Sequence, residues 1–315
     1  HHREGRKIDY LLRYTDSFPL AVVEAKEEGL PAETGLEQAK AYAKDLSVPF
    51  AFSTNGHNII EYDFFTLDSR NIDHFPNPDE LWHRWMINTG LRSPGIAQNR
   101  ASYSLDDATA RRQNPLLYPY CPETITGKSI RYFQEAAINQ VIRRIVKGQK
   151  RILLAMATGT GKTFTAMQLV WKLIKSGWLQ RQHPERPGRI LFLADRVVLR
   201  DQAYNAFSTF SRDGNDPRWL IEGHPPILTR DLYFGIYQSL WIENDQGNRL
   251  FELFPRDFFD IVIIDEAHRS GFGTWQEILK HFGDAIHLGM TATPKTTDNV
   301  DTYDYFCKDE PEILI

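Results

Sequence analysis

Apolar residues in the second half of the chain gather in short continuous runs, with longer stretches of helical composition between them. The runs are RILLAMA (151–157), RILFLAD (189–195), FDIVIID (259–265) and AIHLGMTAT (285–293). Strands buried between two layers of helices appear in sequence as continuous apolar segments of this kind. The pattern from residue 129 onward therefore predicts an α/β domain with a parallel sheet.

The first part of the chain contains shorter strand-like segments around one helical segment. KIDYLLRY (7–14) and FPLAVVEAK (18–26) are separated by turn-forming residues, and PFAFSTNG (49–56) and NIIEYDF (58–64) have the same strand-like composition. LEQAKAYAKDL (36–46) has the composition of a helix. These segments predict a small α/β domain.

Three regions follow from the pattern. We expect a first domain at residues 1–95, a linker at 96–128 and a second domain at 129–315. In the expected linker, Pro, Asn, Asp and Ser replace the periodic apolar positions. A chain of 315 residues with 42% hydrophobic residues can bury two cores of ordinary size.

Composition restricts the function only weakly. The net charge of −4 leaves any nucleic-acid contact to local patches, and the basic run RRIVKGQKR (143–151) is interpreted as a solvated helix face. Cys121 and Cys307 lie far apart in the sequence, as is typical of proteins in a reducing compartment.

Without an apolar run of roughly 18 residues or a signal-peptide pattern, we expect a cytoplasmic protein. The chain does not begin with methionine, so we expect it to be part of a longer protein.

The strongest chemical signal is MATGTGKT (156–163), which follows a strand-like run and precedes the helical FTAMQLVWKLIK. A strand, a glycine-rich turn and a helix form the context of a phosphate-binding loop. Gly159 and Gly161 would let backbone N–H groups surround the phosphates. Lys162 would place its charge on the β and γ oxygens, and Thr163 would offer its hydroxyl to Mg²⁺. The loop residues predicted to bind the nucleotide are Thr158, Gly159, Thr160, Gly161, Lys162 and Thr163.

A second signal, FDIVIIDEAHRS (259–270), places two acids directly after an apolar strand. Asp265, at the carboxyl end of this strand, would hold Mg²⁺ through its water shell, and Glu266 would orient or deprotonate the attacking water. His268 would sense the nucleotide. Each motif alone has a simpler explanation, because G-K-T occurs by chance in loops and D-E pairs are common at strand ends. Their occurrence together favours an ATP site.

In this order, ATGTGKT, DEAH and GMTATP resemble motifs I, II and III of superfamily 2 helicases and translocases. Members of that group often lack the first glycine of the loop, which Met156 replaces here. By this resemblance, Gln134 in IRYFQEAAI contacts the adenine, and Thr291 and Thr293 link the nucleotide state to DNA contacts. LFLADRVVLRDQA and GIYQSL resemble the motifs that grip a DNA strand. The resemblance covers residues 129 to about 300 and implies a RecA-like domain that binds ATP and Mg²⁺.

In the first domain, the strand-like FPLAVVEAKEEG ends with Glu24 and Lys26 on either side of one alanine. Side chains alternate between faces along a strand, so these opposite charges should project from the same face. A surface ion pair, worth about 0 to 1 kcal/mol, is the simpler explanation. Asp9, in the preceding strand, completes the spacing D-x14-E-x-K. Asp16 also precedes Glu24, but it lies in the expected turn.

This spacing resembles the core of PD-(D/E)xK nucleases. The following helix adds Gln38 and Tyr42, one turn apart on one face, as in the Q-x-x-x-Y addition to that core. By the resemblance, Asp9 and Glu24 chelate Mg²⁺, and Lys26 steers or deprotonates the attacking water. Gln38 and Tyr42 would position the DNA or the site. A partly buried helix face is the alternative role for these two residues.

A nuclease of this kind followed by such a translocase resembles the motor (R) subunit of type I restriction enzymes over nearly the whole chain. The resemblance implies ATP-dependent translocation on double-stranded DNA, Mg²⁺-dependent cleavage, and methylation and specificity subunits as partners. The family's second RecA-like domain, whose arginine completes the ATP site, would lie beyond Ile315, so we expect weak ATP hydrolysis by this chain alone. Two alternatives remain: another defence translocase, such as a type III-like subunit, and an ATP-dependent DNA-binding or assembly module with a degenerate nuclease half.

Overall fold

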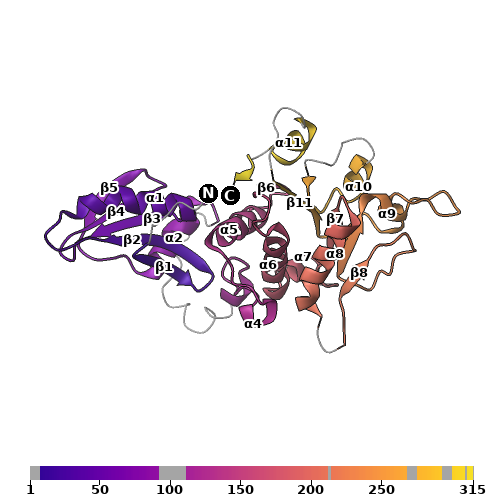
Figure 1. The fold of residues 1–315 in the computed structure, drawn as a ribbon, viewed down its shortest axis with the longest axis horizontal. Coiled ribbons are helices and arrows are strands. Elements are labelled where there is room, and N and C mark those ends of the chain that lie inside the picture. The colour runs from indigo at the N-terminus through magenta and orange to yellow at the C-terminus, as the bar shows by residue number, and fades with distance from the viewer. Residues whose placement is uncertain are drawn as a thin grey trace. The chain divides into compact units, whose positions relative to one another are not determined.

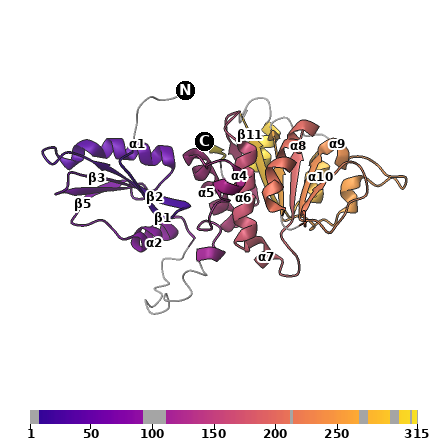
Figure 2. The ribbon, with the colours of Figure 1, turned by 60° about the horizontal axis from the view of Figure 1, so that its bottom comes forward.

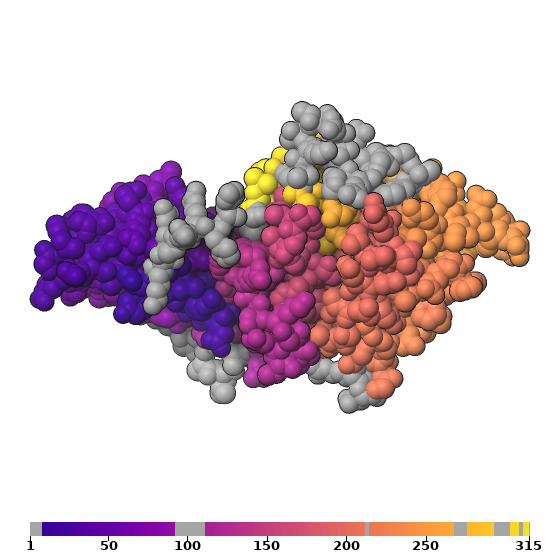
Figure 3. Space-filling model, in the orientation of Figure 1, coloured from indigo at the N-terminus to yellow at the C-terminus, as the bar shows by residue number. Residues whose placement is uncertain are grey.

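The computed structural model describes residues 8–91, 111–211, 214–267, 275–292, 300–308 and 311–314 (Figure 1). Contacts between residues divide the chain into two compact units, residues 1–112 with 116–119 and residues 113–115 with 120–315. Figure 3 shows the surface of the first unit in indigo to purple and that of the second from magenta to yellow. No helix in the described segments is long and apolar enough to cross a membrane.

The first unit is a mixed sheet with a helix on each face. Its strand order is β1-β2-β3-β4-β5, in which β2 and β3 are parallel and the other neighbours are antiparallel. Parallel neighbours need a crossover, and α1 lies in the connection between β2 and β3. The elements are β1 (Tyr10–Thr15), β2 (Phe18–Ala25), the 3₁₀ turn η1 (Ala32–Gly35), α1 (Leu36–Leu46), β3 (Phe50–Thr54), β4 (Ile59–Asp63), β5 (Asp68–Ile72) and α2 (Pro78–Asn88).

The alternation of side chains along the strands assigns each helix to one face of this sheet. Val22 of β2 packs with Tyr42 of α1 in one apolar cluster. Val23, the next residue of β2, points to the other face and lines a cavity together with Leu81 of α2. Figure 2 shows α1 and α2 on opposite sides of the sheet. Glu24, two residues after Val22, therefore projects toward α1.

The second unit is built on a parallel sheet of seven strands in the described residues, in the order β12-β6-β11-β10-β7-β9-β8. All neighbouring strands in it are parallel. Its elements are α4 (Glu123–Thr126), α5 (Tyr132–Val146), β6 (Arg151–Ala155), α6 (Lys162–Lys175), α7 (Trp178–Gln182), β7 (Ile190–Ala194), α8 (Val197–Ala206), η3 (Phe207–Phe210), β8 (Arg218–Leu220), β9 (Leu232–Ile236), α9 (Tyr237–Leu240), η4 (Leu250–Leu253), β10 (Ile261–Ile264), α10 (Trp275–His281), β11 (Ile286–Thr291), α11 (Val300–Phe306) and β12 (Ile313–Leu314).

Both faces of this sheet are covered, which explains its continuous apolar strands. Leu191 and Leu193 of β7 belong to a buried cluster that includes Phe282 and Phe306. Phe192, between them, points to the opposite face and contacts the Phe207 ring at 6.2 Å. The carboxyl ends of the parallel strands meet at one edge of the sheet, where ligands bind in open α/β folds.

The structure confirms the predicted fold class, an α/β chain in which a mixed sheet precedes a RecA-like parallel sheet. Strands β6, β7, β10 and β11 lie within the four apolar runs. The hydrophobic pattern did not predict β5, α2, β8 or β9. In β5 the reason is physical, because four of its five residues are exposed and it therefore has no apolar pattern.

Part of the expected linker is folded. Leu116, Leu117 and Cys121 are buried. The side chain of Gln168 on α6 accepts a hydrogen bond from the Cys121 N–H (2.8 Å) and donates one to the Cys121 carbonyl (3.1 Å). Residues 92–110 lie outside the described part of the chain.

Candidate functional site

Asp9 lies immediately before β1, whereas the sequence predicted it within the strand. The antiparallel register pairs Tyr10 with Val23, so Asp9 is placed beside the last residues of β2. Its Oδ2 accepts a hydrogen bond from the Ala25 N–H at 2.8 Å. The structure therefore brings Asp9 to the strand end that carries Glu24 and Lys26.

A chain of hydrogen bonds connects the other four predicted nuclease residues. Lys26 Nζ lies 3.0 Å from Glu24 Oε1 and donates to Gln38 Oε1 at 3.1 Å. Gln38 Nε2 then donates to the Tyr42 hydroxyl at 3.2 Å. Because Gln38 and Tyr42 are four residues apart on α1, one helix face supplies both. The ammonium of Lys26 is thus held between a strand and a helix.

The Glu24 carboxylate has the properties of a metal ligand. Glu24 is 3% exposed, and its Oε2 has no hydrogen-bond partner among the described residues. A buried carboxylate oxygen without a partner is costly, and a divalent cation would offset that cost. No group of three or more His, Cys, Asp or Glu side chains in the described residues could hold a metal. Asp9 and Glu24 are the two carboxylates at this strand end that could hold Mg²⁺, with water or DNA completing the coordination.

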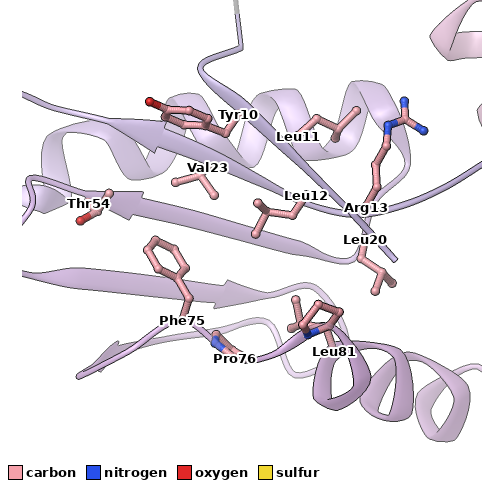
Figure 4. A pocket seen from close by; sticks show the side chains of 11 residues that line it. Tyr10, Leu11, Leu12, Arg13, Leu20, Val23, Thr54, Phe75, Pro76 and Leu81 are labelled. Atoms are coloured by element: carbon pink, nitrogen blue, oxygen red, sulfur yellow. The ribbon is translucent and has the colours of Figure 1, made fainter. Parts of the chain in front are cut away.

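The opposite face of the sheet carries an apolar cavity of about 530 Å³ (Figure 4). Val23 and Thr54 line it, and because they adjoin Glu24 and Ser53 in sequence, they face away from the candidate nuclease site. Phe75 closes another part of its wall. The cavity is consequently separate from the acidic residues.

The phosphate loop lies between β6 and α6, as the sequence predicted. Gly159 and Gly161 have φ angles of +77° and +87°, which are favourable only for glycine. Thr158 is exposed, and the Thr160 hydroxyl donates to the Ala157 carbonyl at 2.6 Å, which closes the turn. Lys162 and Thr163 begin α6, so the helix N-terminus points its free N–H groups at the loop.

Gln134, the predicted adenine contact, is fixed against this loop. Its Nε2 donates to the Thr160 carbonyl at 2.8 Å, and its Oε1 accepts from the Arg131 N–H at 3.0 Å. A Cβ atom on Gly161 would lie 2.7 Å from Gln134 Nε2. Gly161 is therefore required both by its backbone conformation and by the close approach of Gln134.

Asp265 and Glu266 follow β10 and face the phosphate loop. Glu266 Oε1 lies 3.3 Å from Lys162 Nζ, and the Glu266 N–H donates to Asp265 Oδ1 at 3.1 Å. Glu266 has φ +50°, a conformation that costs a residue with a side chain about 1 to 3 kcal/mol. Strain of this size at a strand end is common in functional sites, where the surrounding structure holds it.

Burial shifts the acid–base behaviour of Asp265. Desolvation, and then the neighbouring charge of Glu266, raise the pKa of Asp265 to about 6, against the lowering effect of Lys162. Asp195, at the end of the adjacent strand β7, adds to the rise. Asp195 was not among the residues predicted for this site, because only the strand order β10-β7 reveals that the two acids are neighbours.

The remaining predicted residues of the ATP site are only partly described. Thr291 is buried at the end of β11, and its carbonyl accepts from the Met156 N–H at 2.9 Å, next to the phosphate loop. His268 and Thr293 lie outside the described residues. Their predicted roles stay predictions.

The two segments predicted to grip DNA both follow strands at the carboxyl edge of the sheet. After β7, Arg196, Val197 and Val198 are exposed at the start of α8. The GIYQSL segment contains the last two residues of β9 and then α9, in which Tyr237 is buried. The exposed side chains at the start of α8 and the exposed Gln238 of α9 are therefore available to a ligand.

The basic run at residues 143–151 is a solvated helix face only in part, because Lys147 is exposed but other members of the run are bound to the rest of the unit. Arg144 is buried and donates to the Pro311 carbonyl at 2.6 Å. Lys150 donates to the Asp284 carbonyl, and Arg151 donates to the Gly283 carbonyl at 2.6 Å. These charges bind backbone carbonyls of the same unit, which agrees with leaving them out of the DNA-binding residues.

Comparison with known families identifies the second unit. Residues 127–296, more than half of the chain, match the family described as "Type III restriction enzyme, res subunit". The chain belongs to this family. The matched range contains the phosphate loop and the Asp265–Glu266 pair.

Relatives extend the similarity to both units. The EcoAI type I restriction endonuclease subunit of Escherichia coli is 37% identical over 316 residues, which cover 96% of this chain and 35% of that protein. The EcoKI endonuclease subunit of Escherichia coli is 28% identical, and the match covers 91% of this chain and 28% of that protein. The chain is thus a homologue of type I endonuclease subunits, which confirms the resemblance drawn from the motifs. It spans about a third of the length of these relatives.

A solved structure supports the fold. A fragment described as the HsdR subunit of a type I restriction enzyme from Vibrio vulnificus is 41% identical and superimposes with a TM-score of 0.76. The match covers 98% of this chain and 49% of that chain. The order of a mixed sheet and then a parallel sheet is therefore shared with a type I subunit.

Proposed function

We propose that this chain supplies the nuclease unit and the first ATPase unit of a type I restriction endonuclease subunit. The complete protein would move along double-stranded DNA at the expense of ATP and cleave it with Mg²⁺, in a complex with methylation and specificity subunits. Support comes from the type I relatives, which match 96% and 91% of the chain. Because the chain spans only about a third of their length, these activities belong to the whole protein.

The observation that carries the nuclease proposal is the Glu24 carboxylate. One oxygen accepts from Lys26, and the other is buried without a hydrogen-bond partner in the described residues. Asp9 lies at the same strand end, where its carboxylate accepts from the Ala25 N–H. Mg²⁺ bound by Asp9 and Glu24 would supply positive charge for the scissile phosphate and lower the pKa of a bound water. Lys26 would hold the attacking water or, in its neutral amine form, accept its proton, and Gln38, fixed by Tyr42, would keep Lys26 in place.

The ATPase proposal rests on the phosphate loop and the acids opposite it. Backbone N–H groups of the loop and the Lys162 ammonium would bind the phosphates, and Gln134 would contact the adenine. Thr163 and Asp265 would hold Mg²⁺, and Glu266 would orient the attacking water. Thr291, next to the loop, would pass the nucleotide state to the DNA-binding surface, together with Thr293 and His268.

Calorimetric titration with Mn²⁺ tests the nuclease site. An Asp265→Ala background removes the second metal site, and Glu24→Gln is compared with Glu28→Gln in that background. Glu28 is exposed and pairs with His57 at 2.6 Å, so its variant is a matched loss of one charge. We expect Mn²⁺ binding that Glu24→Gln abolishes and Glu28→Gln preserves. Absence of binding in all three proteins would instead favour an ATP-dependent DNA-binding module with a degenerate nuclease half.

A further inference from the structure

Gly35 occupies the junction between η1 and α1, where the backbone approaches the candidate nuclease residues. The residue is buried, and its φ and ψ angles of −92° and −14° are accessible to any amino acid. A Cβ atom at this position would lie 2.4 Å from Ser53 Oγ, 2.8 Å from Lys26 Cε and 3.2 Å from Glu24 Cγ. Space, and not backbone conformation, therefore requires glycine here.

Ser53 holds the 3₁₀ turn η1 close to the sheet. It lies on β3 directly opposite Glu24 of β2 in the parallel register, and it is fully buried. Its hydroxyl donates to the Ala32 carbonyl at 2.6 Å, which ties the first residue of η1 to the sheet. The turn is thus held down by the residue that neighbours the acidic ligand.

We propose that Gly35 and Ser53 are positioning residues for Lys26. Ser53 holds η1 on the sheet, and Gly35 lets its backbone close over the aliphatic part of Lys26, which confines the ammonium between Glu24 and Gln38. The catalytic consequence rests on the proposed nuclease function, whereas the confinement is a property of the Lys26 side chain that can be measured separately.

A methyl group at Gly35 must displace one of its neighbours. Moving Ser53 Oγ breaks the hydrogen bond to the Ala32 carbonyl, and moving the Lys26 stem separates its ammonium from Glu24 and Gln38. Either response loosens Lys26. Gly29 provides a matched control in the same loop, because a Cβ atom there has no neighbour within 4 Å.

The test is the rate at which an amine-acetylating reagent modifies Lys26, measured by peptide mass spectrometry. Lys40 on α1 is the internal standard, since its side chain is 23% exposed and that of Lys26 is 20% exposed. We expect Gly35→Ala to raise the Lys26 rate about fivefold, as for the loss of a modest ion pair, with Lys40 unchanged. Gly29→Ala should change neither rate.

Two results would overturn the proposal. One is a Lys26 rate in Gly35→Ala equal to that of the unmodified protein, and the other is an equal rise at Lys40, which would indicate opening of the whole helix. In the complete enzyme with its partner subunits, Gly35→Ala should lose DNA cleavage and retain DNA-dependent ATP hydrolysis. If the Mn²⁺ titration shows no metal at Glu24, the nuclease proposal fails, and the acetylation rates still decide whether Gly35 and Ser53 confine Lys26.

Discussion

Lys162 Nζ lies 3.3 Å from Glu266 Oε1, and this contact joins the phosphate loop to the end of β10 across the intervening strand β11. Both side chains are largely buried, with exposed fractions of 10% and 16%. The same ammonium would bind the β and γ phosphates of ATP. Glu266 and a bound nucleotide would therefore compete for Lys162, and the carboxylate would also repel the phosphates.

Glu266→Gln should consequently bind ATP more tightly. The amide keeps the shape of the side chain but removes the competing charge, and we expect an affinity gain of about three- to tenfold together with a loss of hydrolysis. Titration with a fluorescent ATP analogue measures the affinity. Glu277→Gln is the control, because Glu277 is exposed and pairs with Arg249 away from the loop. Weaker binding by Glu266→Gln would show that the acid supports the nucleotide instead of competing with it.

Nucleotide binding should also depend on the protonation of Asp265. Burial, and then the charge of Glu266, raise its pKa to about 6, so the carboxylate is charged above that pH and neutral below it. We expect the affinity for Mg²⁺–ATP to fall as the pH decreases through 6. Because ATP itself takes up protons in this range, the same titration with Asp265→Asn gives the baseline. Identical pH profiles for the two proteins would contradict the assignment of Asp265 as a Mg²⁺ ligand.

Spacing along the chain was sufficient to predict residues that the structure brings together at both candidate sites. Glu24 and Lys26 share a face because strands alternate, and Gln38 and Tyr42 share one because helices repeat every three to four residues. The position of Lys162 and Thr163 at the start of a helix follows from the pattern of strand, glycine-rich turn and helix around them. In each case the local geometry of one element fixes the relation, so no knowledge of the tertiary structure is needed.

Contacts between different helices and strands could not be predicted from the spacing of residues along the chain. The approach of Gly35 to Ser53 depends on the register of β2 against β3, and the effect of Asp195 on Asp265 depends on the order of β7 and β10. Neither leaves a periodic signal, because the partners are far apart in sequence and each is ordinary in its own segment. The burial of Arg144 was missed for the same reason, since its acceptor is the Pro311 carbonyl.

The buried Lys172 should make the second unit more stable in alkaline solution. Lys172 is fully buried on α6, with its ammonium 4.1 Å from the Tyr120 ring centroid. Desolvation lowers its pKa to about 7, against the raising effect of Glu135. The unfolded chain therefore binds more protons between pH 7 and about 10, and stability rises with pH across that window.

Lys172→Met tests this directly. The wild-type chain should gain on the order of 2 kcal/mol between pH 7 and pH 9 relative to the variant, measured from urea midpoints followed by tryptophan fluorescence. Lys175→Met, on the same helix, is the control, because Lys175 lies over the Trp171 ring at 5.1 Å and its removal leaves the Lys172 contribution in place. An equal pH dependence in wild type and Lys172→Met would mean that Lys172 keeps its ordinary pKa.

At the amino ends of the parallel strands, away from the phosphate loop, Asp260 stabilises the fold. It lies immediately before β10. Its carboxylate accepts two hydrogen bonds from Arg186, at 2.8 and 3.1 Å, and one from the Arg189 N–H at 2.6 Å, and it lies 3.2 Å from His183 Nε2. Asp260→Ala removes the carboxylate from Arg186, which keeps only the Pro187 and Asp257 carbonyls as acceptors, and leaves the Arg189 N–H without its acceptor. The loss should cost about 2 to 4 kcal/mol. The Tm of the second unit should then fall by roughly 5 to 10 °C in calorimetry. Asp257→Ala, an exposed acid in the same loop, should leave the Tm unchanged, and an equally small effect of Asp260→Ala would show that water can replace the carboxylate at this end of the strands.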